Sequence, residues 1–241
     1  MRLRQHNSDA DTRDAIKLTA QRLFAKRGID GVSVREIVVA AGQRNGGSLH
    51  YHFGTKEALV RELIVDGAKQ IDDRRRLMLD TIESSAKTPP TLRQVIEALV
   101  LPSINLPGEE RGVGTYIRFI NVLQMSHRQM FLDALDNQWN SGYLRCLALI
   151  RKLIPSVPPL ILNQRLIFMG IYLPAILAAR EAALDEQRGA HPFWSAPHTI
   201  ENLIDSIEHL IDGPASMQSK QRVIKAAARR SSANKSKVTA A

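Results

Sequence analysis

The segment 33–57, SVREIVVAAGQRNGGSLHYHFGTKE, constrains this chain more than any other stretch of its 241 residues. Ser33 stands three residues before Glu36 and just ahead of an apolar run, which is the spacing of a capping box at the start of a short helix. A polar turn with two glycines then separates this helix from a second short segment, 48–53. Two short helices joined by a glycine-containing turn predict a helix-turn-helix.

The second helix of this motif divides its side chains between a core and an outer face. Leu49 and Phe53 lie four residues apart, so both can pack on the same side. Ser48, His50 and Tyr51 can hydrogen-bond or stack on the other side. This division suits a helix that enters the major groove of double-stranded DNA.

The net charge of +9 is unevenly distributed. Residues 1–60 carry ten Lys/Arg against six Asp/Glu, residues 61–213 carry 16 against 18, and residues 214–241 carry seven against none. Basic surface attracts phosphate backbones, so the two ends are the candidate contacts with nucleic acid.

Composition places the chain among cytoplasmic globular proteins. A hydrophobic content of 44% is ample for a core, and the single cysteine, Cys146, cannot form an intrachain disulfide. We expect Cys146 to be an apolar filler on a helix face. No uninterrupted apolar run approaches 18 residues and the N-terminus has no apolar core, so we expect neither a membrane span nor a signal peptide.

Helical periodicity continues along the chain and predicts an all-α fold of about nine helices. The expected helices cover 12–27, the two of the 33–53 motif, 56–84, 91–104, 114–126, 129–154, 160–184 and 199–212. In the long fourth helix, Leu77 is expected to face inward with the other apolar residues, and the charged run at 72–76, DDRRR, is expected on a solvated face. Pro174 should kink the 160–184 helix.

We expect four parts: a flexible lead (1–11), a helix-turn-helix domain (12–58), a helical effector-binding and dimerisation domain (59–213) and a basic disordered tail (214–241). The tail is rich in Ser and Ala and lacks a large apolar set to bury. It is either a passive solubilising segment or an extra nonspecific contact with DNA.

The chain resembles the tetracycline-repressor (TetR/AcrR) family of transcriptional regulators over about residues 12–65. The resemblance rests on AIKLTAQRLFAKRGIDGVSVREI, then AAG, then LHYHFGTKEALV. It implies a three-helix DNA-binding head on a larger helical body that binds a ligand and dimerises through its last two helices. The stretch before the His-Phe pair is one residue longer than the family pattern, so the family's phosphate-contacting tyrosine matches neither His50 nor Tyr51 unambiguously.

The expected DNA contacts fall in this head. Lys56 matches the family lysine that grips phosphate at the start of the fourth helix. Arg44 and Asn45 are the residue types that read guanine and adenine. The full set of expected contacts is Ser33, Arg35, Gln43, Arg44, Asn45, Gly47, Ser48, His50, Tyr51 and Lys56.

Several of these residues have plainer interpretations. Ser33 is also explained as a helix cap alone, and Arg35 as a solvated charge. His50 and His52 are two residues apart on a helix and point away from each other, so no metal site is expected there.

In the body, aromatic and polar residues are candidates for an apolar effector pocket, with an ordinary packed core as the alternative for each. These candidates are Tyr116, Asn121, Met125, Trp139, Tyr143, Phe168 and Tyr172, together with Met169. The apolar stripe of the last helix, with the 160–184 helix, is expected to form a homodimer interface through Ile200, Leu203, Ile204, Ile207 and Leu210.

These features favour a dimeric repressor that binds a palindromic operator and is released by a small, largely apolar effector. The alternative is a DNA-binding regulator with no small-molecule effector, controlled by a protein partner or acting as an activator. No nucleophile–base pair, metal-ligand spacing or phosphate-binding glycine loop is found, so we expect no enzyme activity, no cofactor and no metal.

Overall fold

The computed structural model describes residues 2–43, 47–85, 89–104, 106, 114–186 and 191–225, and only the backbone for residues 2–8 and 85. Within these ranges the chain is helical, without strands, as expected. Its elements are α1 (Arg2–Arg27), α2 (Val34–Ala40), α3 (Gly47–Phe53), α4 (Lys56–Ser85), α5 (Leu92–Val100), the 3₁₀ helix η1 (Leu101–Ser103), α6 (Tyr116–Ser126), α7 (Arg128–Leu135), α8 (Ser141–Leu153), α9 (Pro159–Glu186) and α10 (Thr199–Asp212).

These described elements make eleven helices rather than about nine, and residues 217–225 are helical as well. The helix expected at 129–154 is in fact two helices. Asp136, Asn137 and Trp139 have φ values of 43°, 55° and 56°, and left-handed residues cannot continue a right-handed helix. The expected flexible lead is also helical, since α1 begins at Arg2 and nothing in its sequence, which lacks Gly and Pro before Gly28, breaks the helix.

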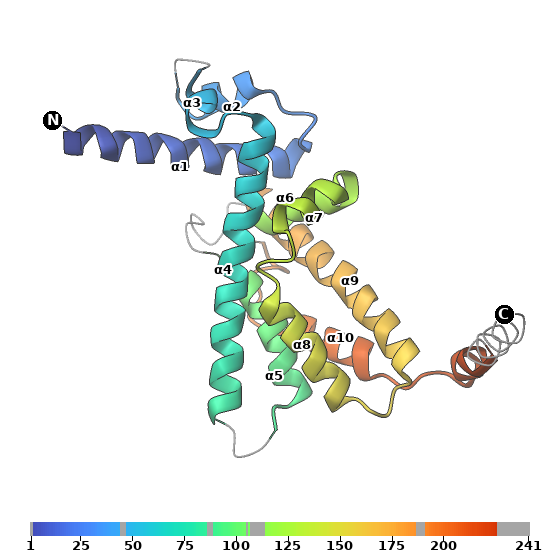
Figure 1. Ribbon diagram of the computed structural model, residues 1–241. Helices are drawn as coiled ribbons and strands as arrows, with labels where there is room; N and C mark the ends of the chain where they lie inside the picture. Colours follow the sequence, from blue (N-terminus) through green and yellow to red (C-terminus); the bar gives the residue numbers. More distant parts are fainter. Residues whose placement is uncertain are drawn as a thin grey trace, which may run out of the picture.

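The first three helices and the start of α4 form a small head (Figure 1). Each of these four helices contributes at least one fully buried side chain to the core of the head. These are Ile16 and Phe24 from α1, Ile37 from α2, Leu49 from α3 and Leu59 from α4. The apolar positions predicted for the helix-turn-helix therefore anchor it to α1 and α4.

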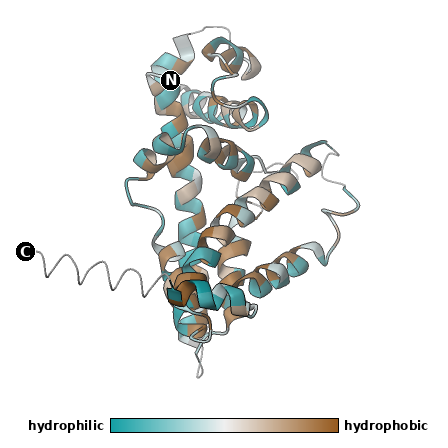
Figure 2. Cartoon of the chain, turned by 90° about the vertical axis from the view of Figure 1, so that its right-hand side faces the viewer, coloured by the Kyte–Doolittle hydropathy of each residue, from teal (hydrophilic) through white to brown (hydrophobic). Residues whose placement is uncertain are grey.

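The remaining helices form a larger body along the rest of α4, which runs from the head down one side of the molecule (Figure 1). α5, α7 and α8 pack against α4, while α9 packs against α6 and α10 against α5. Most helices carry both hydrophilic and hydrophobic residues in Figure 2, as helices do when one face covers a core.

The middle of α4 corrects the expectation for the charged run 72–76. Asp72 and Arg75 are only 2% and 7% exposed, whereas Leu77, expected inward, is 69% exposed. The Asp72 carboxylate accepts hydrogen bonds from Ser141 Oγ and Gly142 N, both at 2.8 Å. Arg75 donates to the carbonyls of Ala98 and Leu99 at 3.0 and 3.1 Å. Two charges one turn apart thus hold the first residues of α8 and the last turn of α5.

Among the described residues, α9 is the one helix long and apolar enough to cross a membrane by length and composition, with a mean hydropathy of 1.6 in its most apolar window. Core helices of soluble proteins satisfy the same criteria. Only 33% of that window is buried within this chain. The outer face of α9 exposes Ile167, Phe168 and Ile171 by 63%, 56% and 55%.

Candidate nucleic-acid interface

The start of α2 is fixed by the predicted capping box. Glu36 N donates to Ser33 Oγ at 3.3 Å, and Ser33 N donates to the Glu36 carboxylate at 2.8 Å. Arg27, the last residue of α1, pairs with the same carboxylate at 2.8 Å. The backbone hydrogen bond from Ser33, then its hydroxyl and Arg27, lower the pKa of Glu36 to about 2. Ser33 is thus a helix cap in this structure, and its exposure leaves room for the predicted DNA contact.

α3 separates its two faces as predicted from the sequence. Leu49 is fully buried and Phe53 is 9% exposed, with the Arg13 guanidinium 4.8 Å from the Phe53 ring centroid. Tyr51 is 76% exposed and meets the His52 ring edge-on, with 4.9 Å between the ring centroids. The exposed face of α3 therefore carries a ring that is free to contact another molecule.

The end of α3 is held by local hydrogen bonds. His50 Nδ1 lies 2.5 Å from the carbonyl oxygen of Gly54, whose φ of 74° turns the chain toward α4. Thr55 Oγ1 accepts from Ala58 N at 3.0 Å and caps the first turn of α4. His50 therefore stabilises the turn between α3 and α4, and its side chain is also exposed, as the predicted DNA contact requires.

Lys56 lies where the first turn of α4 meets the loop between α1 and α2. Its Nζ donates to the carbonyl oxygens of Ile29 and Val32, each at 2.9 Å. An ammonium group has three donors, so one remains for another acceptor such as phosphate. The structure therefore adds a positioning role that the sequence pattern did not indicate.

The remaining predicted contacts lie around α2 and the turn. Arg35 and Gly47 are exposed and Ser48 is half-buried. Gln43 is half-buried, and its side chain donates to the Ala41 carbonyl at 3.4 Å. Arg44 and Asn45 lie outside the residues that the structure describes, so their expected role in base reading stays a prediction.

A contact between head and body was missed by the sequence analysis. The rings of Phe24 in α1 and Phe119 in α6 stack with 6.1 Å between centroids, and Gln21 donates to Thr115 Oγ1 at 3.0 Å. Lys26 of α1 also pairs with Asp185 near the end of α9 at 2.7 Å. The helical spacing of Phe24 and Phe119 indicates only that each faces a core, and it does not indicate that the two rings join the head to the body.

α9 also holds α6 in place. The buried Glu181 carboxylate accepts hydrogen bonds from Ile117 N at 3.1 Å and Arg118 N at 2.7 Å, in the first turn of α6. A carboxylate at a helix N-terminus interacts favourably with the positive end of the helix dipole. α6 thus touches the head on one side and α9 on the other.

The residues expected to line an effector pocket are not gathered into one of the two cavities described here. Tyr116 is a core residue, because it is 4% exposed and its hydroxyl donates to the Ile64 carbonyl at 2.9 Å. Met125 is 70% exposed, and the Trp139 ring lies 5.4 Å from Lys69 Nζ. Asn121 and Tyr143 are half-buried, Met169 is fully buried, and burial raises the pKa of the Tyr143 hydroxyl.

The two described cavities each include one predicted pocket residue. Phe168 lines a groove of about 680 Å³ between α9 and residues 214–223. Tyr172 lines a cavity of about 150 Å³ beside α10 and the residues before it. Cys146 is fully buried, as expected, and burial raises the pKa of its thiol to about 11.

The apolar stripe of α10 is buried largely by its own chain. Leu203, Ile204 and Ile207 are 7%, 1% and 0% exposed, and α10 packs on α5 and α9. Ile200 and Leu210 are half-buried. Leu203, Ile204 and Ile207 therefore offer little surface for the expected contact between copies, whereas α9 exposes an apolar face.

Residues 214–225, expected to be disordered, also pack on the body. Ala215 and Val223 contact its core, and residues 217–225 are helical. The rest of the predicted tail, 226–241, lies outside the described residues.

Comparison with known proteins finds a family match within the head and similarity to curated relatives over longer stretches. Residues 18–63 match the sequence model of the family described as "Bacterial regulatory proteins, tetR family". The HTH-type transcriptional repressor KstR2 of Mycolicibacterium smegmatis is 37% identical over 75 residues, which are 31% of this chain and 36% of that protein. KstR2 of Mycobacterium tuberculosis is 29% identical over 135 residues, 52% of this chain and 66% of that protein. The chain thus spans between about one third and two thirds of the length of these relatives.

Most of the chain also has a solved structural counterpart. A crystal structure of a protein assigned to the tetR family of transcription regulators, from Shewanella sp. PV-4, aligns with a TM-score of 0.51 and 19% sequence identity. The alignment covers 81% of this chain and 95% of that one. At this identity the likeness supports the arrangement of helices and nothing finer.

Proposed function

The chain belongs to the tetR family of bacterial regulatory proteins, and on this premise we propose that it is a sequence-specific DNA-binding transcriptional regulator. The observation that carries the proposal is the two-faced α3, with Leu49 and Phe53 buried and Tyr51 exposed. A recognition helix must be anchored on one side so that its other side can enter the major groove.

The contacts follow from the positions of the residues around α3. Arg35, Ser48 and Tyr51 are assigned to base edges and the adjacent backbone. The same role is proposed for Arg44 and Asn45 from the sequence alone. Lys56 and Ser33 are assigned to phosphates, while each also holds the head together. Phosphate contacts set affinity and salt dependence, and base contacts set sequence preference.

We further infer a repressor that acts as a homodimer on a two-fold symmetric operator, since the relatives found are described as repressors. The exposed apolar face of α9 beyond the first half of the helix, represented by Ile171, is assigned to the contact between copies. Apolar residues exposed along one helix face are typical of an interaction surface. A symmetric dimer would present two recognition helices to two half-sites.

The arrangement of the body also favours the second candidate, a regulator of this fold that needs no effector in its core. The observation is Tyr116, whose ring fills the space above Gly67 so closely that a Cβ at Gly67 would lie 2.1 Å from the ring. A residue expected to line a pocket is instead close-packed between α4 and α6.

Sequencing of DNA fragments retained by the purified protein tests the proposal. A shared palindromic motif among the retained fragments, lost on Tyr51→Ala substitution, is the expected outcome. Retention of fragments without a common motif would contradict sequence-specific binding. Titration of the retained operator with small-molecule libraries then separates the effector-controlled repressor from the second candidate.

A further inference from the structure

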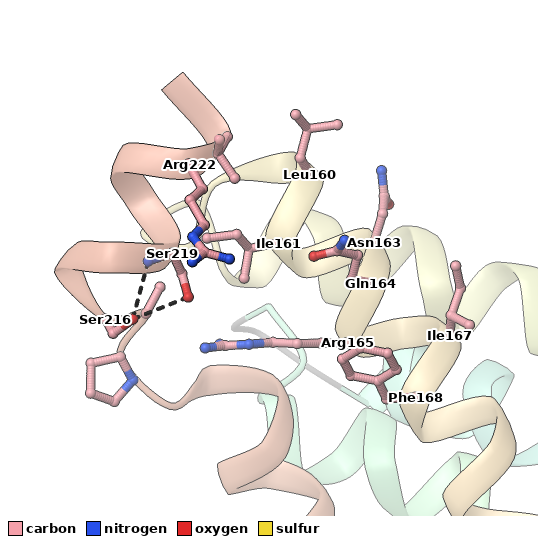
Figure 3. A pocket seen from close by; sticks show the side chains of 13 residues that line it. Leu160, Ile161, Asn163, Gln164, Arg165, Ile167, Phe168, Ser216, Ser219 and Arg222 are labelled. Atoms are coloured by element: carbon pink, nitrogen blue, oxygen red, sulfur yellow. Dashed lines mark hydrogen bonds between the residues drawn. The ribbon is translucent and has the colours of Figure 1, made fainter. Parts of the chain in front are cut away.

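The groove of about 680 Å³ is built from two segments far apart in the sequence. One wall is the first half of α9 and the other is the segment 214–223 that follows α10 (Figure 3). Sites for small organic ligands commonly enclose about 300–1,000 Å³. The groove is therefore large enough for a small molecule, and nothing in the proposed function uses it.

One end of the groove is cationic. The guanidinium groups of Arg165 and Arg222 lie toward the end formed by residues 214–219, as Figure 3 shows. Arg165 Nη1 donates to the Ile211 carbonyl at 2.7 Å, which holds this guanidinium in place. None of the described residues pairs with Arg222, and no Asp or Glu is among the residues that line the groove. Two positive charges without a carboxylate, of which Arg165 is held in place and Arg222 is exposed, favour binding of an anion.

The backbone at the same end adds to this preference. Ser216 Oγ accepts a hydrogen bond from Ser219 N at 3.2 Å and caps the helical segment 217–225. The first turn of that segment therefore opens onto the cationic end, and helix N-termini favour anions.

The other end of the groove exposes two apolar side chains beside the amides of Asn163 and Gln164. Ile167 and Phe168 lie on α9 away from the arginines (Figure 3) and are 63% and 56% exposed. Removing exposed apolar area from water is favourable, so a hydrocarbon chain that covers these side chains gains free energy.

We propose that this groove binds an amphipathic anion of the fatty-acid class. The carboxylate lies between Arg165 and Arg222, and the hydrocarbon chain runs over Ile167 and Phe168. Arg suits this role because its planar guanidinium meets a carboxylate through two parallel hydrogen bonds. Because the groove is positively charged at one end and has apolar side chains at the other, its ligand must carry both a negative charge and a hydrocarbon chain.

A second copy of the chain is a poorer occupant of this groove. In a two-fold contact the same patch meets itself, so two grooves would bring four guanidinium groups together without a facing carboxylate from either groove. Ile171 lines neither of the two described cavities and stays available for the contact between copies.

The inference does not rest on DNA binding. If the chain is a ligand-responsive regulator, the groove is its effector site, because α9 lines the groove at one end and holds α6 through Glu181 at the other. Binding of the anion is measured without DNA, so its failure and the failure of the proposed function are separate results.

Isothermal titration of the full chain with decanoate tests the proposal, with 1-decanol and acetate as probes that each lack one half of the ligand. We expect decanoate to bind with one site per chain and at least about tenfold more tightly than either probe. Loss of one charged hydrogen-bond partner costs a factor of about ten to one hundred in affinity. Arg222→Ala should weaken decanoate binding by that factor, and Phe168→Ser should weaken it as well.

Lys220→Ala is the matched control, because Lys220 lies on the same helical segment as Arg222, is exposed, and does not line the groove. It removes one positive charge and should leave decanoate affinity unchanged. Thermal melting confirms that each variant is folded. Equal binding of decanoate and 1-decanol, or equal affinity of the Arg222→Ala and Lys220→Ala variants, would overturn the proposal. A Phe168→Ser variant that sediments differently from the wild type but binds decanoate with the same affinity would also overturn the proposal, because the groove would then be a contact between copies.

Discussion

Asp72 and Arg75 show how two charged residues can be buried for a structural purpose. Asp72 binds groups at the N-terminus of α8, where the helix dipole is positive, and Arg75 binds carbonyls at the C-terminus of α5, where it is negative. Burial lowers the pKa of the Arg75 guanidinium, and the nearby Asp72 carboxylate opposes this change. A Cβ at Gly142 would lie 3.1 Å from atoms of both side chains, so glycine suits this position.

We predict that Asp72→Ala destabilises the chain by about 2–5 kcal/mol, because it leaves the N–H of Gly142 without its partner and the Arg75 charge without its neighbour. Urea unfolding monitored by circular dichroism measures this change. Asp73→Ala is the control: Asp73 is 51% exposed and contacts only Arg76, at 3.7 Å, among the described residues. Its effect should stay within about 0.5 kcal/mol. Equal effects of the two substitutions would mean that the buried contacts contribute nothing.

Glu36 gives a prediction about pH. Its pKa is lowered to about 2 in the folded chain, so its carboxylate stabilises the fold fully above the ordinary value near 4.5 and loses this contribution as pH falls toward 2. A carbon-detected NMR titration should find Glu36 still ionised at pH 3. Ser33→Ala should raise the pKa of Glu36 toward its ordinary value, because it removes the hydroxyl that donates to the carboxylate. An unchanged pKa in this variant would contradict the assigned cause.

Lys56 has a positioning role and a proposed phosphate contact, and a substitution separates them. Lys56→Met should reduce stability by about 1–3 kcal/mol, because the carbonyls of Ile29 and Val32 lose their donor. It should also weaken binding to every DNA sequence alike and lower the salt slope by about one unit. Arg61→Ala, which removes an exposed charge from the same helix, is the control for general electrostatics. An unchanged melting temperature with a changed sequence preference would reverse both assignments.

At the scale of single elements, patterns within a few residues indicate helix caps, whereas they do not indicate contacts between helices that are far apart in the sequence. The capping boxes Ser33–Glu36 and Thr91–Gln94 both form, because a cap depends only on residues three apart. Ser126 and Gln129 have the same spacing but form no capping box, since Ser126 is the last residue of α6 and α7 has His127 at its N-cap. The burial of Asp72 depends on where α5 and α8 end, which no local pattern shows.

The stripe of α10 illustrates a second limit of sequence patterns. Periodicity shows that one face of a helix is apolar, but it does not show whether that face meets its own chain or another copy. Ile207 meets its own chain, so Ile207→Arg should unfold the body, because an unpaired charge would be buried there. This substitution therefore does not test the dimer.

Ile171→Arg is the test of the dimer that the structure supports. Ile171 is 55% exposed in the single chain, so arginine is tolerated there without loss of folding. We expect the wild-type chain to sediment as a dimer and this variant as a monomer with an unchanged melting temperature. A wild-type chain that is monomeric at micromolar concentration would contradict the proposed contact.

At the scale of the whole molecule, the head could be described from the sequence more fully than the body. The head is a short-range motif whose caps and apolar spacing fix its core, including Leu49 and Phe53. The body depends on which helices meet, and the loop at Asp136–Trp139 and the contact of Phe24 with Phe119 had no local signal. The residues expected to line a pocket are distributed over the body for the same reason, because aromatic residues at helical spacing serve cores and cavities equally well.

The charge of the whole chain gives the last prediction. Residues 226–241 carry four Lys/Arg and no Asp or Glu. The segment 214–225 packs on the body, so a deletion that tests the role of the tail should begin at residue 226. Removal of 226–241 should leave the melting temperature and sequence preference unchanged. It should weaken nonspecific DNA binding, strongly at low salt and little at high salt, and lower the salt slope by at most about four units, because each phosphate contact contributes about 0.9.

Fluorescence anisotropy with an operator and a scrambled duplex, at several salt concentrations, measures both quantities. Identical salt slopes for the truncated and full chains would make the tail a passive segment, and a loss of operator preference would place part of the sequence-reading surface in it.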